Sequence, residues 1–212
     1  IAFLNVFMNY FCNPSYGENG QGIYTMNSWA DVDLFMLDDR WWRSADNLLD
    51  SIDGKPNPEK VVFGEQQMRW FKNAITYSTA TFKIVVTGSQ VLNPVSSFDK
   101  LLNFPKEYYE IMHFLELQKI EGVLFLTGDR HHSEIIKVQR PNAYPLYDIT
   151  ISPLTSGTHV FAENEKNNPY RVAGVDQKQN YGKFTVSGGS KDRSLKVEMI
   201  GINGEILDSY TI

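Results

Sequence analysis

The chain has 212 residues, enough for one large domain, or a substantial part of one, with a core of its own. Its apolar fraction of 42% and its 13 Phe, 11 Tyr and 4 Trp exclude a disordered or low-complexity composition. A net charge of −5 without a long basic run argues against duplex nucleic acid as a partner. No apolar run approaches the roughly 20 residues of a membrane span, and the one cysteine, Cys12, excludes an intrachain disulfide.

The chain starts inside a structural pattern and not at a methionine. Ile1 opens the amphipathic run of residues 1–11, which is typical of the end of a helix. We therefore expect a processed or truncated product, with any address signal and an N-terminal half of the fold outside the printed chain.

Helical and strand patterns alternate through the first half. The run at 32–39 is almost wholly apolar and ends in acids, which predicts a strand buried on both faces. Apolar side chains at helical spacing predict a helix over 64–78. The segment 82–90 predicts a strand that runs into glycine and polar residues. Loops are expected at 12–25 and 44–62.

The second half turns from mixed to purely β patterns. Pro105 opens a helix of about 15 residues, which Gly122 ends. Strands follow at 123–127 and 146–153, and 156–182 reads as a long polar loop that is functional or mobile. The closing segments predict antiparallel strands around a hairpin turn; they are 183–186, the alternating run 195–199, the turn Asn203-Gly204 and the return 205–212.

This order of elements predicts an α/β fold with mainly parallel strands that ends in antiparallel strands, as part of one domain over 1–212. Three of the predicted strands end in small or polar residues. In open α/β sheets, ligands bind beyond the carboxyl ends of the strands. We therefore expect one polar rim built from segments far apart in the chain, namely Asp38 and Asp39, 88–90, and 128–131.

The strand end 123-VLFLTGDRHHSE-134 carries the strongest candidate for a metal site. Gly128 permits a bend, after which Asp129 and His131 can turn toward one point. A carboxylate oxygen and an imidazole nitrogen suit Zn, Mn or Fe, and oxygen alone suits Ca. Two ligands do not make a site by themselves. The alternative is that Asp129 caps the next turn and that His131 or His132 is an ordinary surface residue.

Weaker candidates lie at 38-DDRWWR-43, Ser89 and His159. Arg40 and Arg43 can clamp a phosphate, but a salt-bridged strand end with packed tryptophans is the favoured interpretation of this run. No G-x-S-x-G motif surrounds Ser89, which argues against a serine hydrolase. His159 either faces the rim or is an ordinary loop histidine.

Several segments together resemble the C-terminal part of the PhoD-like metallophosphoesterases, the alkaline phosphatase D family. The similarity runs across most of the chain. It implies a calcineurin-like α/β/β/α sandwich with metals at the strand ends. The matching segments are 13-NPSYG-17, 22-GIYTMNSWADVDLFMLDDRWWR-43, 64-GEQQMRWFKNAITYSTATFKIVVTGSQ-90, 122-GVLFLTGDRHHSE-134, 147-YDITISPLTSG-157, 180-NYGKFTV-186 and 203-NGEILDSYTI-212.

The resemblance also implies roles for single residues. In the wider superfamily a late Gly-His-x-His motif supplies two metal ligands, and 128-GDRH-131 is its match here. Asp129 and His131 are therefore expected to bind metal, with Ca or Fe first and Mn or Zn as alternatives. Arg130, and more weakly Arg40, are expected to stabilise transition-state charge. Substrate-binding roles are expected for Arg43, Gln90 and His132.

The function implied for the whole enzyme is metal-assisted hydrolysis of phosphate monoesters or diesters, in the periplasm or outside the cell. The family's early Asp, Asn, Cys and Tyr motifs have no match in this chain. We therefore expect that the chain supplies part of the site and is weakly active or inactive alone. The alternative is a non-catalytic binding or structural module on the same scaffold. The sequence does not indicate an oligomeric state.

Overall fold

The computed structural model describes residues 2–212, and its elements belong to two units. The first unit comprises the chain up to Thr87 together with Leu101–Val123, and the second comprises Gly88–Lys100 and Leu124–Ile212. Each unit buries its own set of apolar side chains. No helix in this part of the chain is long and apolar enough to cross a membrane. The predicted domain boundaries stay predictions.

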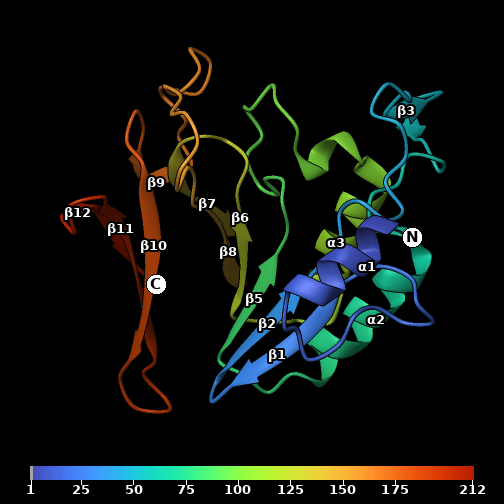
Figure 1. The fold of residues 1–212 in the computed structure, drawn as a ribbon, viewed down its shortest axis with the longest axis horizontal. Helices are drawn as coiled ribbons and strands as arrows, with labels where there is room; N and C mark the ends of the chain where they lie inside the picture. The colour runs from blue at the N-terminus through green and yellow to red at the C-terminus, as the bar shows by residue number, and fades with distance from the viewer. Residues whose placement is uncertain (1) are drawn as a thin grey trace. The chain divides into compact units, whose positions relative to one another are not determined.

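The first unit combines a small set of strands with two long helices (Figure 1). β2 (Val32–Met36) pairs in parallel with β5 (Phe82–Val86). The buried Phe35 of β2 contacts Phe71 of α2 (Gly64–Tyr77), with ring centroids 6.0 Å apart, so α2 packs on the strands through its apolar face. The other elements are α1 (Ala2–Tyr10), β1 (Thr25–Trp29, antiparallel to β2), β3 (Ser51–Ile52), β4 (Lys55–Pro56), the 3-10 helix η1 (Leu101–Asn103) and α3 (Pro105–Leu117).

The start of α2 is capped from outside the helix. Its N-cap residue, Phe63, makes no capping hydrogen bond through its side chain. Instead the buried carboxylate of Glu107, on α3, accepts the backbone N–H groups of Val62, Phe63 and Gly64 at 2.6, 3.0 and 2.8 Å. Burial raises the pKa of Glu107, although the three hydrogen bonds act to lower it. The contact satisfies N–H groups that α2 cannot pair internally, and it joins the two helices.

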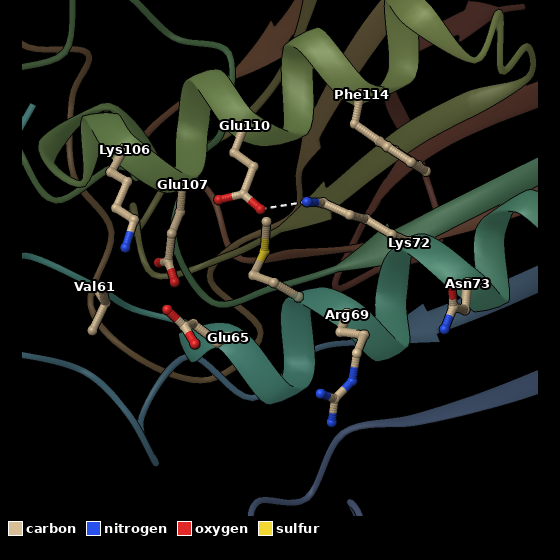
Figure 2. A pocket seen from close by; sticks show the side chains of 10 residues that line it. Val61, Glu65, Arg69, Lys72, Asn73, Lys106, Glu107, Glu110 and Phe114 are labelled. Atoms are coloured by element: carbon tan, nitrogen blue, oxygen red, sulfur yellow. Dashed lines mark hydrogen bonds and ion pairs between the residues drawn. The ribbon is translucent and has the colours of Figure 1, made fainter. Parts of the chain in front are cut away.

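A groove of about 400 Å³ runs between α2 and α3 (Figure 2). Lys72 of α2 and Glu110 of α3 form an ion pair across it, and Glu107 lies in its wall. Because Glu107 is committed to backbone N–H groups and Lys72 to Glu110, these charges serve the packing of the two helices. We conclude that the residues of this groove have a structural role in packing the two helices together.

The second unit holds two sheets (Figure 1). In the larger one β6 (Val123–Thr127) runs parallel to β8 (Ala143–Thr150), and β7 (Ser133–Arg140) lies antiparallel between β8 and β9 (Arg171–Val175). A backbone N–H of β9 donates to Asp208 Oδ2 at 2.8 Å, which ties the two sheets together. The smaller sheet is antiparallel, with strand order β10 (Asn180–Ser187), β11 (Ser194–Gly201) and β12 (Ile206–Thr211).

The predicted α/β class with antiparallel strands at the C-terminus is confirmed. β6 occupies the predicted 123–127, and α2 and α3 begin at the predicted Gly64 and Pro105. The hairpin at Asn203-Gly204 joins β11 to β12 as expected. The predicted helix at the start of the chain is α1, apart from Ile1, which lies outside the described residues.

Several other expectations were wrong. The loop predicted at 156–182 contains β9 and the start of β10, and β7 was not predicted at all. The segment 44–62 contains the short β3–β4 pair, and β1 is a further strand that was not foreseen. β2 alternates between half-buried and buried residues, so it is not buried on both faces. Antiparallel strands lie beside the parallel pairs, so the strand pairing is mixed and not mainly parallel as expected.

Replacing Glu107 with Ala tests the cap of α2. We expect the free energy of unfolding to fall by about 2–4 kcal/mol, because three N–H groups lose their acceptor. Urea denaturation followed by circular dichroism measures this loss. Glu110→Ala is the matched control, since it removes only a partly exposed ion pair and should cost less than about 1 kcal/mol. Equal losses in the two variants would contradict the cap.

Candidate active site

The chain bends sharply where β6 ends. Gly128 N donates to the Gly88 carbonyl at 3.2 Å, and Arg130 N donates to the Gly128 carbonyl at 2.9 Å. Asp129 and His131 have positive φ values of 64° and 59°. Residues other than glycine rarely adopt this left-handed conformation, which costs free energy and is concentrated at functional sites. Arg130 is buried between them, whereas Asp129 is exposed and His131 is half-buried.

The ring of His131 is held in one orientation. Its Nδ1 lies 2.6 Å from the Gly157 carbonyl oxygen, and the ring stacks on His159 with centroids 4.5 Å apart. The His159 N–H donates to the His131 carbonyl at 2.8 Å. Because a carbonyl oxygen only accepts, Nδ1 is the donor in this contact and Nε2 takes no part in it. This is the arrangement that metal-ligating histidines show, with the other ring nitrogen hydrogen-bonded to fix the tautomer.

These residues fit a metal ion as a partial set of ligands. The exposed carboxylate of Asp129 and Nε2 of His131 offer one oxygen and one nitrogen, which Zn, Mn and Fe accept. Within the described residues no group of three or more His, Cys, Asp or Glu side chains is placed to hold a metal ion. Metal sites take four or more ligands. A metal ion bound here would therefore need further ligands beyond this pair.

Shortly after the bend in the chain, four side chains surround the buried carboxylate of Glu134. Gln90 Nε2 and Asn93 Nδ2 donate to Oε1 at 2.7 and 3.1 Å, and Arg171 Nε donates to Oε2 at 2.8 Å. His132 Nε2 lies 3.4 Å from Oε1. Burial alone would raise the pKa of Glu134, but the hydrogen bonds and the Arg171 charge outweigh it and hold the pKa at about 2. The carboxylate is therefore ionised at neutral pH.

His132 is left with one unsatisfied atom. The side chain is 1% exposed, and its Nδ1 is the one buried side-chain nitrogen or oxygen without a hydrogen-bond partner in the part of the chain that the structure describes. Nε2 faces the ionised Glu134 carboxylate, and Nδ1 faces away from this contact. An unpaired buried polar atom costs free energy, and a hydrogen-bond partner in the adjoining cavity would satisfy it.

The guanidinium of Arg130 takes part in a buried hydrogen-bond network. Its Nη1 donates to Gln90 Oε1 and to Ser96 Oγ, and its Nη2 donates to both carboxylate oxygens of Glu165 at 2.9 and 2.8 Å. Arg130 is 7% exposed and Glu165 is fully buried. A paired and desolvated guanidinium of this kind fixes the surrounding segments in place. Its predicted catalytic role stays a prediction.

A second carboxylate, Asp148 on β8, is also fully buried. It accepts the N–H groups of Val91 and Leu92 at 2.6 and 2.8 Å and the Thr127 hydroxyl at 2.8 Å. Burial raises the pKa of Asp148 to about 6, against the effect of these hydrogen bonds. The contacts hold the segment after Gln90 against the end of β6.

A cavity of about 750 Å³ opens at the bend. Asp129, Arg130, His131 and His132 all line it, together with His159, which shows that the loop histidine does face this rim. Gln90 is fully buried and reaches the rim only through its bond to Arg130. The remaining lining residues are Phe98, Asp99, Thr158, Val160 and Ala162.

Comparison with known proteins identifies the family to which the chain belongs. Residues 10–191 match the family model described as PhoD-like phosphatase. The chain belongs to the PhoD-like phosphatase family. Alkaline phosphatase D of Bacillus subtilis (strain 168) is 26% identical over 113 residues, which is 46% of this chain and 19% of that protein. The solved structure of PhoD superposes on the whole chain with a TM-score of 0.72 at 17% identity, a likeness of fold, and the chain covers 45% of it.

For this family member, the two other predicted arginines lie in the first unit. Arg40 is exposed, with Nε 3.7 Å from Asp39. Arg43 pairs with Asp46 at 2.7 Å and lies over the Phe104 ring. These contacts agree with the packing interpretation of the run 38–43, and the predicted catalytic and substrate-binding roles of the two arginines stay predictions.

The network behind the bend was missed by sequence reasoning. Glu134 and Asp148 each lie within a largely buried strand, and a lone acid in such a strand is a signal that could have indicated a buried hydrogen-bond centre. Glu165 had no comparable signal, because it lies in a polar segment far from Arg130 in sequence.

The raised pKa of Asp148 predicts a pH dependence of stability. A carboxyl whose folded pKa of about 6 exceeds its ordinary 3.8 makes the folded state lose stability as the pH rises through this interval, on the order of 3 kcal/mol in total. Glu134 acts with the opposite sign below pH 4.5, where falling pH removes its contribution. We expect Asp148→Asn to weaken the dependence between pH about 4.5 and 6, and the raised pKa of Glu107 to account for part of what remains.

The free energy of unfolding, measured by thermal and urea denaturation across this pH range, tests the prediction. Glu163→Gln is the control, because Glu163 is an exposed carboxylate paired only with Lys166 at the surface. A variant Asp148→Asn whose stability follows the same pH curve as the parent would refute the assignment.

Proposed function

We propose that this chain forms part of the active site of a metal-dependent phosphate-ester hydrolase, in which Asp129 and His131 are metal ligands. The observation that carries the proposal is the left-handed bend that presents both residues to one cavity, with His131 Nδ1 hydrogen-bonded to the Gly157 carbonyl. Membership of the PhoD-like phosphatase family supports the reaction class.

Asp129 and His131 would hold Ca or Fe first, with Mn or Zn as alternatives. A bound metal ion supplies Lewis-acid polarisation of the phosphoryl oxygen and a water of lowered pKa. The chain's own residues hold the ligands in position. The Glu134 and Arg130 networks fix the segments on either side of the bend, and the stacked His159 restrains the His131 ring.

The chain spans about a fifth of the curated relative that it matches and less than half of the solved PhoD chain. The substrate and activity of the whole protein are therefore part of this proposal, as is its location in the periplasm or outside the cell. With Asp129 and His131 as the proposed ligands, the remaining ligands would come from other segments.

Two other functions compete. A non-catalytic module on the same scaffold would keep the fold and lack turnover. A metal-independent hydrolase would use Ser89, whose Oγ donates to Asp99 Oδ2 at 2.7 Å. That contact supplies a carboxylate partner but not the histidine of a Ser-His-Asp arrangement.

Hydrolysis of p-nitrophenyl phosphate and bis(p-nitrophenyl) phosphate by the whole protein that contains this chain, with Ca, Mn, Zn or Fe added, tests the proposal, because the chain by itself offers only a partial set of ligands. We expect turnover that chelator abolishes and that Asp129→Ala and His131→Ala each lower by about 100-fold or more. Lys166→Ala is the control, since Lys166 is exposed and pairs only with surface Glu163. Turnover that survives chelator and requires Ser89 would replace the proposal with the serine hydrolase, and no turnover with any metal would favour the module.

A further inference from the structure

The cavity at the bend is lined by apolar as well as polar residues. Phe98 and Val160 both line it, and each is 55% exposed although both are large apolar side chains. Ala162 extends the same lining. Single exposed apolar residues are ordinary at protein surfaces. Here, however, two that come from distant segments share one cavity with Asp129 and His131.

Phe98 is held in position by its neighbours. Its ring lies 4.8 Å from Arg130 Cζ, and the Arg130 guanidinium is itself fixed by Glu165. The Phe98 N–H donates to Ser96 Oγ at 3.2 Å, and the same oxygen accepts from Arg130 Nη1 at 2.6 Å. One face of the ring is therefore used by the cation, and the ring is positioned before any ligand arrives.

The backbone around Val160 is fixed on both sides. The His159 N–H donates to the His131 carbonyl at 2.8 Å, and the Phe161 N–H donates to Asp176 Oδ2 at 3.0 Å. Val160 is thus an apolar side chain that the fold keeps in the cavity lining and partly exposed to solvent.

We propose that the cavity accepts phosphate esters with a bulky apolar or aromatic organic group, which lies on Phe98 and Val160 while the phosphoryl group lies at Asp129 and His131. The cavity of about 750 Å³ is in the range of small-molecule sites, which combine apolar walls with few polar groups, and exceeds what a phosphate alone would fill. The inference rests on the proposed function for the phosphoryl group, but the apolar contact is measurable without turnover. An ester of a small polar alcohol would leave Phe98 and Val160 exposed.

Binding of phenylphosphonate and methylphosphonate to the chain with saturating Zn added, followed by NMR titration, tests the proposal because the two probes share one phosphonate head group and the metal ion offsets the charge of the Asp129 carboxylate. We expect phenylphosphonate to bind about tenfold more tightly. Phe98→Ala and Val160→Ala should each reduce this preference to about threefold or less, and Phe98→Leu should keep most of it. Leu154→Ala is the control, since Leu154 is 67% exposed, lies nearby in sequence and does not line the cavity.

Equal affinities for the two probes would overturn the proposal, as would a preference that survives the Phe98→Ala/Val160→Ala double variant. Absence of binding by both probes would also overturn it, because Phe98 and Val160 would then contribute nothing. The proposed hydrolase function and the proposed apolar site can be refuted independently of each other. A phenyl preference without hydrolysis by any metal-loaded form would remove the hydrolase and keep the apolar site, whereas hydrolysis without a preference would do the reverse.

Discussion

The buried Glu134 carboxylate is the constraint on which the second unit depends. It pairs with Arg171 of β9, accepts from Gln90 and Asn93 of the segment 88–100, and lies beside His132 at the bend. Removing a buried ion from water is expensive, so such a carboxylate is retained only when several donors surround it. Once these donors are assembled, the end of β6, the start of β7 and two loops have little freedom to move apart.

The neighbouring contacts extend this constraint. Arg130 connects Gln90 to Glu165, and Asp148 holds the backbone of Val91 and Leu92. The strained left-handed backbone at Asp129 and His131 persists because this network determines it from both sides. The rigid part of the unit is thus polar and buried, and the exposed part is the bend that presents the two predicted ligands. This division between a fixed support and an open ligand pair is what a metal site requires.

The spacing of apolar residues and the residue types at turns predicted those elements whose local sequence follows a single clear pattern. β6 is an uninterrupted apolar run, α2 and α3 have helical apolar spacing, and the closing hairpin has an Asn-Gly turn. β7 was missed because Ile135, Ile136 and Val138 neither form an uninterrupted apolar run nor alternate regularly, and charged residues lie among them. β9 was missed because it is short and follows a polar segment, and only its pairing with β7 makes it a strand.

The residues of the candidate site likewise fall into those that a local motif indicates and those that only tertiary contacts bring together. Asp129 and His131 could be predicted because a local motif carries them, and the structure places both at one cavity. The partners of Arg130 and Glu134 depend on tertiary contacts between segments that share no motif, so local sequence did not indicate them. The sequence indicated Arg130 as a candidate for stabilising transition-state charge, and this role stays a prediction; the acceptors that surround the side chain were not foreseen. The exposed apolar wall at Phe98 and Val160 likewise became visible only when the two segments were brought together.

The most direct test of the account is where a metal ion binds. Titration of the isotopically labelled chain with Mn²⁺, followed by paramagnetic broadening of backbone NMR signals, locates the ion without any need for turnover. The account predicts that the first signals to broaden belong to residues 128–132 and 157–159, and that the Asp129→Ala/His131→Ala variant loses this effect. Broadening centred on other acidic residues, or unchanged broadening in the variant, would contradict it.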